Sequence, residues 1–145
     1  MRRGVLLVVV AALVAGCGPS GPPTTETTSA GFATLAEKVA FLEAYVRFRR
    51  NYEQLDFAIE YHNNSGGMVP GPSEWDVRIV AVVPPSELDA WTTGLSPAAS
   101  PDTAWLAGVP TPIDHSGVTQ WFRKGGVVVG VDEGGAVVVY RNLAM

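Results

Sequence analysis

The first long hydrophobic pattern of the chain has a helical period. Between residues 32 and 51, apolar side chains recur at spacings of four, three and four residues, at Leu35, Val39, Leu42 and Val46. Aromatic residues widen this stripe, while acidic residues lie early and arginines lie late in the segment, which suits a helix dipole. The pattern predicts one long amphipathic helix whose broad apolar face covers a core.

From about residue 54 the period changes to two, which indicates β-strands. Apolar and polar residues alternate over 55–61, and again over 75–83, where the pattern becomes apolar on both faces toward the end. A further strand is expected over 118–123, and 127–131 pairs with 136–140 around a glycine-bearing turn. Strands that are apolar on both faces lie in the middle of a sheet or are covered on both sides.

The remaining segments complete the predicted fold. Residues 84–87 open a short helix that runs to about Trp91, and residues 92–117 show no long pattern, so we expect a loop pinned by Trp105. The order of elements predicts an α+β fold over residues 32–145. It is a two-layer domain in which a mostly antiparallel sheet of about five strands packs on one long N-terminal helix. A half-open barrel is the alternative.

The start of the chain has the pattern of a secretory signal. Two arginines follow Met1, an apolar run of ten residues extends over 5–14, and small residues come next. Val14-Ala15-Gly16-Cys17 resembles the lipobox of bacterial lipoproteins. The resemblance implies that residues 1–16 are removed as a signal peptide and that the thiol of Cys17 carries a diacylglycerol. The protein would then be exported and lipid-anchored at the cell membrane or the outer membrane.

The segment after the signal is expected to be a tether. Residues 17–31 comprise Cys17 and a run of Gly, Pro, Ser, Thr and Glu that has no large apolar side chain to bury, so the run predicts a flexible spacer. Ten basic residues less Arg2 and Arg3 leave eight against fourteen acidic residues, a formal charge of −6. This excess argues against a nucleic-acid partner and against attraction to an anionic bilayer, so the lipid has to supply the membrane attachment.

Little in the chain carries catalytic chemistry. The single cysteine excludes an internal disulfide and a multi-cysteine metal site. The sequence has no nucleophile elbow, no closely spaced histidine pair and no phosphate-binding loop. Asp56 and Glu60 share a strand face at roughly 13 Å, beyond the roughly 5 to 9.5 Å that glycosidases use. We therefore predict no catalytic residue, no metal and no cofactor.

The most unusual local chemistry lies at the end of the first predicted strand. Tyr61, His62, Asn63 and Asn64 precede a Ser-Gly-Gly turn, and Trp75 follows eight residues after that turn. Amides, an imidazole and an aromatic ring in one loop suit polar ligands such as sugars or extended peptides. The competing interpretation is turn chemistry, in which asparagine side chains bond to their own backbone.

Two functional hypotheses follow. The leading one is a non-enzymatic envelope module that binds a protein or cell-wall partner, with His115 of the long loop as a further candidate binding residue. The alternative is a small envelope hydrolase or metal-dependent enzyme that uses His62, His115 and Asp114. The alternative requires the two histidines to lie within about 10 Å of one another.

Overall fold

The structure, a computed structural model, describes residues 24–64, 71 and 73–144. The predicted signal peptide, the lipobox with Cys17 and residues 18–23 of the predicted tether lie outside the described residues. Residues 65–70 and 72, which belong to the predicted binding loop after Asn64, lie outside them as well.

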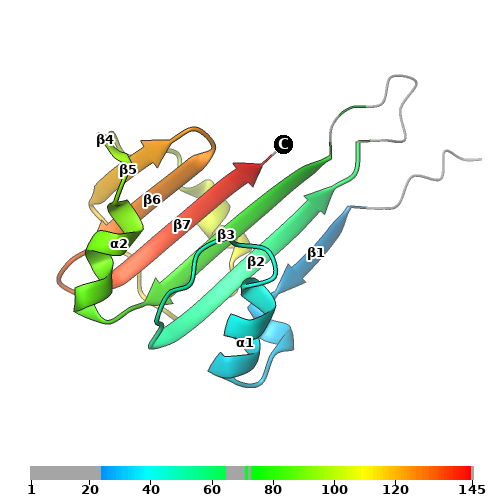
Figure 1. Cartoon of the computed structure of the whole chain (residues 1–145), viewed down its shortest axis with the longest axis horizontal. Helices are drawn as coiled ribbons and strands as arrows, with labels where there is room; N and C mark the ends of the chain where they lie inside the picture. Colours follow the sequence, from blue (N-terminus) through cyan, green and yellow to red (C-terminus); the bar gives the residue numbers. More distant parts are fainter. Residues whose placement is uncertain (1–23, 65–70, 72, 145) are drawn as a thin grey trace, which may run out of the picture.

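The described residues form one seven-stranded antiparallel sheet with a few short helical segments (Figure 1). The strands are β1 (Thr25–Thr28), β2 (Gln54–His62), β3 (Glu74–Val82), β4 (Ser96–Ala98), β5 (Gln120–Lys124), β6 (Val127–Asp132) and β7 (Val137–Ala144). The helices are η1 (Ser29–Gly31), α1 (Leu35–Leu42), η2 (Pro85–Glu87), α2 (Leu88–Thr92) and η3 (Ala104–Gly108). The spatial order is β1-β2-β3-β7-β6-β5-β4, so β1 and β4 are the edges of an open sheet.

The predicted fold is wrong in its strand number and in its long N-terminal helix. The five expected strands are present as β2, β3, β5, β6 and β7, but β1 and β4 extend the sheet, and α1 has only eight residues. α1 begins with a capping box, in which the Thr34 hydroxyl accepts from the Glu37 N–H and the Glu37 carboxylate accepts from the Thr34 N–H. It ends at Leu42, before the arginines that suggested a longer helix.

An irregular segment, residues 43–52, replaces the second half of the predicted helix. The Arg49 guanidinium donates to two backbone carbonyls inside this segment. Phe48 packs edge-on against Trp91 and Tyr140, with ring centroids 5.2 and 5.4 Å apart. The apolar residues of this segment are therefore spaced so that their side chains contact the sheet, although the backbone that carries Phe48 is not helical.

Residues 25–31 belong to the fold, in contrast to the solvated tether expected over 18–31. All four residues of β1 pair with β2. Ser29 is fully buried, and its hydroxyl donates to the Asp56 carboxylate at 2.9 Å. β-branched threonines suit an extended edge strand, and a serine hydroxyl is small enough to fit beside a buried carboxylate. Only residues 18–24 are left to connect Cys17 to the sheet.

Both faces of the sheet are covered. On the α1 side, side chains such as Phe57 and Ile79 lie under α1, the 43–52 segment and α2. On the other face, Val80 and Val139 lie under the loop between β4 and β5, which contributes three buried side chains, Leu106, Val109 and Ile113. This arrangement confirms that the strands with apolar residues on both faces, β3 and β7, are central and covered on both sides. The long loop predicted over 92–117 is thus largely a packed cover.

Candidate functional site

Three aromatic side chains gather at one end of the sheet, on the α1 side. Trp75, near the start of β3, lies opposite Tyr61, near the end of β2, with ring centroids 4.6 Å apart. Tyr45, from the segment after α1, lies 5.2 Å from Trp75. We refer to Tyr45, Tyr61 and Trp75 as the aromatic cluster. Tyr45 is 41% exposed and Trp75 is 38% exposed.

The aromatic cluster continues into the hydrophobic core, which holds its rings in place. Tyr45 contacts Phe41 at 5.1 Å, and Phe41 stacks on the fully buried Phe57 at 5.8 Å with an angle of 8° between the ring planes. Rings supported in this way lose little freedom when a partner binds, so the surface is pre-organised.

A groove of about 650 Å³ opens beside the aromatic cluster. Tyr45 and Trp75 line it together with residues of β3 and β7, and Arg47 and Asn142 add polar groups. Burial raises the pKa of Tyr140, which also lines the groove. Apolar walls with a few polar groups are typical of ligand sites of this size.

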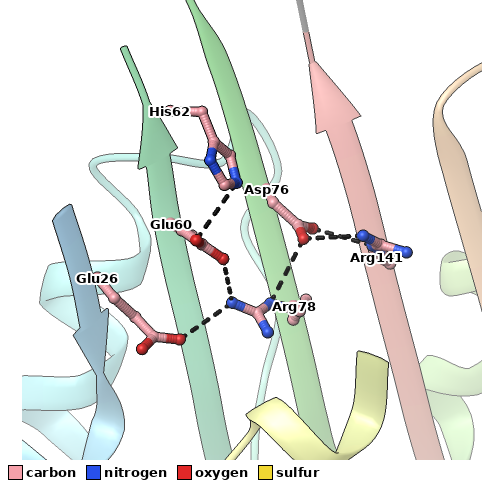
Figure 2. Close-up of polar contacts among 6 residues, drawn as sticks. All are labelled: Glu26, Glu60, His62, Asp76, Arg78 and Arg141. Carbon is pink, nitrogen blue, oxygen red and sulfur yellow. Dashed lines mark hydrogen bonds and ion pairs between the residues drawn. The ribbon is translucent and has the colours of Figure 1, made fainter. Parts of the chain in front are cut away.

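The opposite face of the sheet carries an ion-pair network at the same end (Figure 2). The Arg78 guanidinium of β3 donates to Glu26 of β1 and to Glu60 of β2, both at 3.1 Å. Arg141 of β7 donates to both carboxylate oxygens of Asp76, at 3.0 and 2.9 Å. We refer to six residues as the charged network: Glu26, Glu60, His62, Asp76, Arg78 and Arg141.

The centre of the charged network is closed to solvent. The Arg78 side chain is only 8% exposed, and its Nε lies 3.6 Å from Asp76. Gly108, at the end of η3, covers the guanidinium so closely that a Cβ would collide with it. The candidate residue His62 joins at the rim, where its Nε2 lies 3.4 Å from Glu60. Because the carboxylates are paired with cations across four strands, the arrangement holds strands together and offers no free nucleophile.

His115 lies in the loop between β4 and β5. Its Nδ1 is 3.1 Å from the Ile113 carbonyl, and a proton on Nδ1 makes that contact a hydrogen bond and leaves Nε2 as an acceptor. The neighbouring Asp114 accepts from the Ser116 backbone N–H, which lowers the pKa of Asp114. His115 borders a hollow of about 620 Å³ whose lining includes hydroxyl side chains, Ser100, Thr103, Thr111 and Ser116.

The structure does not bring His62 and His115 into one site. Gly117, two residues after His115, lies against Asp132, which the pairing of β6, β7, β3 and β2 places level with Gln54. His62 is eight residues further along β2, about 26 Å away at ~3.3 Å per residue. The described ranges also contain no group of three or more His, Cys, Asp or Glu side chains that could hold a metal ion. The enzyme that shares both histidines with Asp114 loses its geometric basis.

The other predicted binding residues are divided between the two faces. Asn63 and Asn64 follow β2 directly, and the Asn64 carbonyl accepts from the Gly71 N–H at 3.0 Å, which closes the connection toward β3. His62 belongs to the charged network on the face away from α1. Trp75 alone of the predicted residues is part of the aromatic cluster.

Tyr45 is a binding candidate that the sequence pattern does not single out, and Tyr61 begins the unusual stretch before the Ser-Gly-Gly turn but is not among the predicted binding residues. Tyr61 falls on the apolar side of an alternating strand, which indicates a core residue. Pairing the two predicted strands as a hairpin would have placed it near Trp75, as the register of β2 and β3 does. Tyr45 falls on the apolar stripe of the predicted helix, and it reaches the surface because α1 ends at Leu42.

Within residues 24–64, 71 and 73–144, none of the helices combines the length and the apolar character that a membrane crossing requires. A scan against protein-family models, a search of curated proteins and a search of solved structures each find no match to the chain.

Proposed function

We propose that this chain is a lipid-anchored lipoprotein of the bacterial envelope whose described residues form a non-enzymatic binding module. The lipobox resemblance of residues 14–17 supports an anchor on Cys17. The observation that carries the binding role is the aromatic cluster, in which Tyr45 and Trp75 are both about two-fifths exposed above a rigid aromatic base.

Aromatic rings that touch one another at a surface favour a binding role. Contiguous apolar patches are uncommon on monomeric proteins and usually mark an interaction site. Aromatic side chains provide large contact areas at a low cost in conformational entropy, and they are frequent among the residues that dominate binding energy. The adjacent groove, with Arg47 and Asn142, adds polar contacts that could give specificity for an envelope protein or a cell-wall polymer.

The anchor is tested by Cys17→Ser. A serine hydroxyl cannot form the thioether, so the acyl chains and their roughly 0.8 kcal/mol per buried CH₂ are lost. We expect the variant to leave the membrane fraction of expressing cells, while the wild-type chain stays there through a high-salt wash. Retention of the variant in salt-washed membranes would contradict the anchor.

The binding role is tested by co-sedimentation of a Cys17→Ser chain, which carries no lipid, with washed bacterial envelopes. Tyr45→Ser with Trp75→Ser removes two of the three rings and should abolish most of the binding. Leu35→Ser is the matched control, because Leu35 is 37% exposed but belongs to the first turn of α1, away from the aromatic cluster. Equal binding by the wild type and the double variant would contradict the role of the aromatic cluster.

A further inference from the structure

The chain enters the sheet at the end that carries the aromatic cluster. Thr25, the first residue of β1, lies opposite Tyr61, and Tyr61 lies opposite Trp75. Trp75 lies opposite Ala144, the last residue of β7. The start of β1 and the ends of β2 and β7 accordingly lie at the same end of the sheet, the upper end in Figure 1, where C marks the end of the chain after β7. The segment that comes from Cys17 thus joins the fold only two strands from Trp75.

The connection between the anchor and the sheet is short. Seven residues, 18–24, separate Cys17 from Thr25. Eight residue steps span at most about 29 Å when fully extended, and a flexible chain of that length averages roughly 15–17 Å. β2 and β3 have nine residues each, which makes the sheet about 30 Å long in this direction. A lipid on Cys17 therefore keeps the Thr25 end of the sheet near the bilayer and favours an orientation with the other end turned away.

We propose that the aromatic cluster docks on the surface of the lipid bilayer that holds Cys17. This inference rests on the proposed lipid anchor and names the bilayer as the partner of the proposed binding surface. Tyrosine and tryptophan combine an apolar ring with a polar O–H or N–H, and both are enriched at the level of the lipid headgroups. Ala144, opposite Trp75 at the end of β7, is the β7 residue at this end that lies on the same face as the aromatic cluster.

The charges at this end are compatible with a membrane surface. The three carboxylates of the charged network are paired with its two guanidiniums, so they present little net charge to a bilayer. Arg47 is exposed beside the groove, where its guanidinium can donate to lipid phosphates. Glu74, the first residue of β3, adds a fourth carboxylate at this end. Four carboxylates against the three guanidiniums of Arg47, Arg78 and Arg141 leave a formal −1, compared with −6 for residues 17–145. The repulsion from an anionic bilayer at this end is therefore a small part of that expected from the whole chain.

Tethering makes a small docking surface sufficient. A short flexible linker gives the anchored module an effective concentration in the millimolar range at the bilayer. A contact that is too weak to recruit a free chain is therefore populated once Cys17 is anchored. Docking would fix the orientation of the module and would bring the groove beside the aromatic cluster to the headgroups.

A chemical anchor tests the docking independently of the native lipid. Cys17 is the only cysteine, so residues 17–145 can be coupled there to a maleimide phospholipid in phosphatidylcholine vesicles. Brominated acyl chains in the vesicles quench tryptophans that reach the bilayer. We expect strong quenching of the anchored wild type and loss of most of it in Trp75→Phe. Trp91 and Trp121 are buried, and Trp105→Phe is the matched control that should keep the quenching.

A second attachment point tests the orientation. Glu133→Cys in a Cys17→Ser chain moves the anchor to the turn between β6 and β7. This turn is level with the start of β2, at the far end of the sheet from Tyr61. The aromatic cluster then faces away from the bilayer, and the quenching that depends on Trp75 should be lost. Thermal melts of every variant confirm that the fold is retained.

Three results would overturn the docking. Equal quenching from both anchor positions is the first, and quenching that Trp75→Phe leaves unchanged is the second. The third is the absence of quenching in the anchored wild type, while binding to washed envelopes still depends on Tyr45 and Trp75. That result would assign the aromatic cluster to an envelope macromolecule and leave the proposed function standing. Failure of the anchor is seen separately, because Cys17→Ser would then remain in cell membranes, and the docking would fall with it.

Discussion

At the scale of single residues, Arg78 is the point where the charged network converges. Its guanidinium donates to Glu26 of β1 and Glu60 of β2 and lies under the backbone of Gly108, so water has little access to it. A buried ion pair is worth little compared with a well-packed apolar pair, but removing one partner leaves the other charge uncompensated. The position therefore matters far more to stability than a surface arginine does.

We expect Arg78→Ala to lower the free energy of unfolding by about 1–3 kcal/mol, because it removes the guanidinium from Glu26 and from the part-buried Glu60. Arg49→Ala is the matched control, since the Arg49 side chain is 62% exposed in its ion pair with Glu43, and such surface pairs contribute at most about 1 kcal/mol. Urea denaturation of the three chains measures both effects. Equal midpoints for the two variants would show that the charged network does not stabilise the sheet.

At the scale of elements, the strands with clear alternation could be predicted and the edge strands could not. β2 and β3 have nine residues each, and a two-residue period is visible over that length. β1 has four residues and β4 three, too few to show a period, and their sequences of threonine, serine and proline also suit a loop. The short edges become strands because β2 and β5 offer them unpaired backbone groups.

The length of α1 could not be predicted for a different reason. A spacing of three and four residues requires only that side chains face the same surface, and the 43–52 segment meets this requirement although its hydrogen-bonded turns end at Val46. The start of α1, in contrast, has a local sequence signal, the capping box formed by Thr34 and Glu37. The prediction over 32–51 relied on the apolar stripe and the charge distribution and did not use this capping signal.

The pairing of β1 with β2 predicts that a chain starting at Phe32 is less stable than one that contains β1. The shorter chain lacks Ser29, which donates to the buried Asp56, and Glu26, which binds Arg78. Loss of a partner for a buried polar group costs about 1–3 kcal/mol, which corresponds to several degrees in melting temperature. A chain that starts at Thr24 keeps β1 and is the control. Equal melting temperatures for the two chains would show that β1 does not stabilise the fold and behaves as part of the tether.

At the scale of the whole molecule, the candidate site depends on the register between distant segments. Trp75 and the His62 end of β2 stood out in the sequence because unusual residue types cluster there. The meeting of Tyr45 with Trp75 required the end of α1 and the packing of the 43–52 segment, which no local pattern encodes. The pairing of Thr25 with Tyr61 could not be predicted from the sequence either. This pairing determines which end of the sheet an anchor on Cys17 would hold at the membrane.

The length of the tether should therefore control the docking. Inserting twenty glycine and serine residues after Ser20 raises the number of residue steps between Cys17 and Thr25 from 8 to 28. The effective concentration of the module at the bilayer then falls roughly sixfold, since it decreases with about the −3/2 power of linker length. The ratio of docked to undocked chains, measured by bromolipid quenching of Trp75 on the maleimide-anchored chain, should fall by the same factor. Inserting the same residues between Gly134 and Gly135, in the turn between β6 and β7, is the control and should leave the ratio unchanged. A ratio that does not respond to tether length would mean that the tether is not what brings the aromatic cluster to the bilayer.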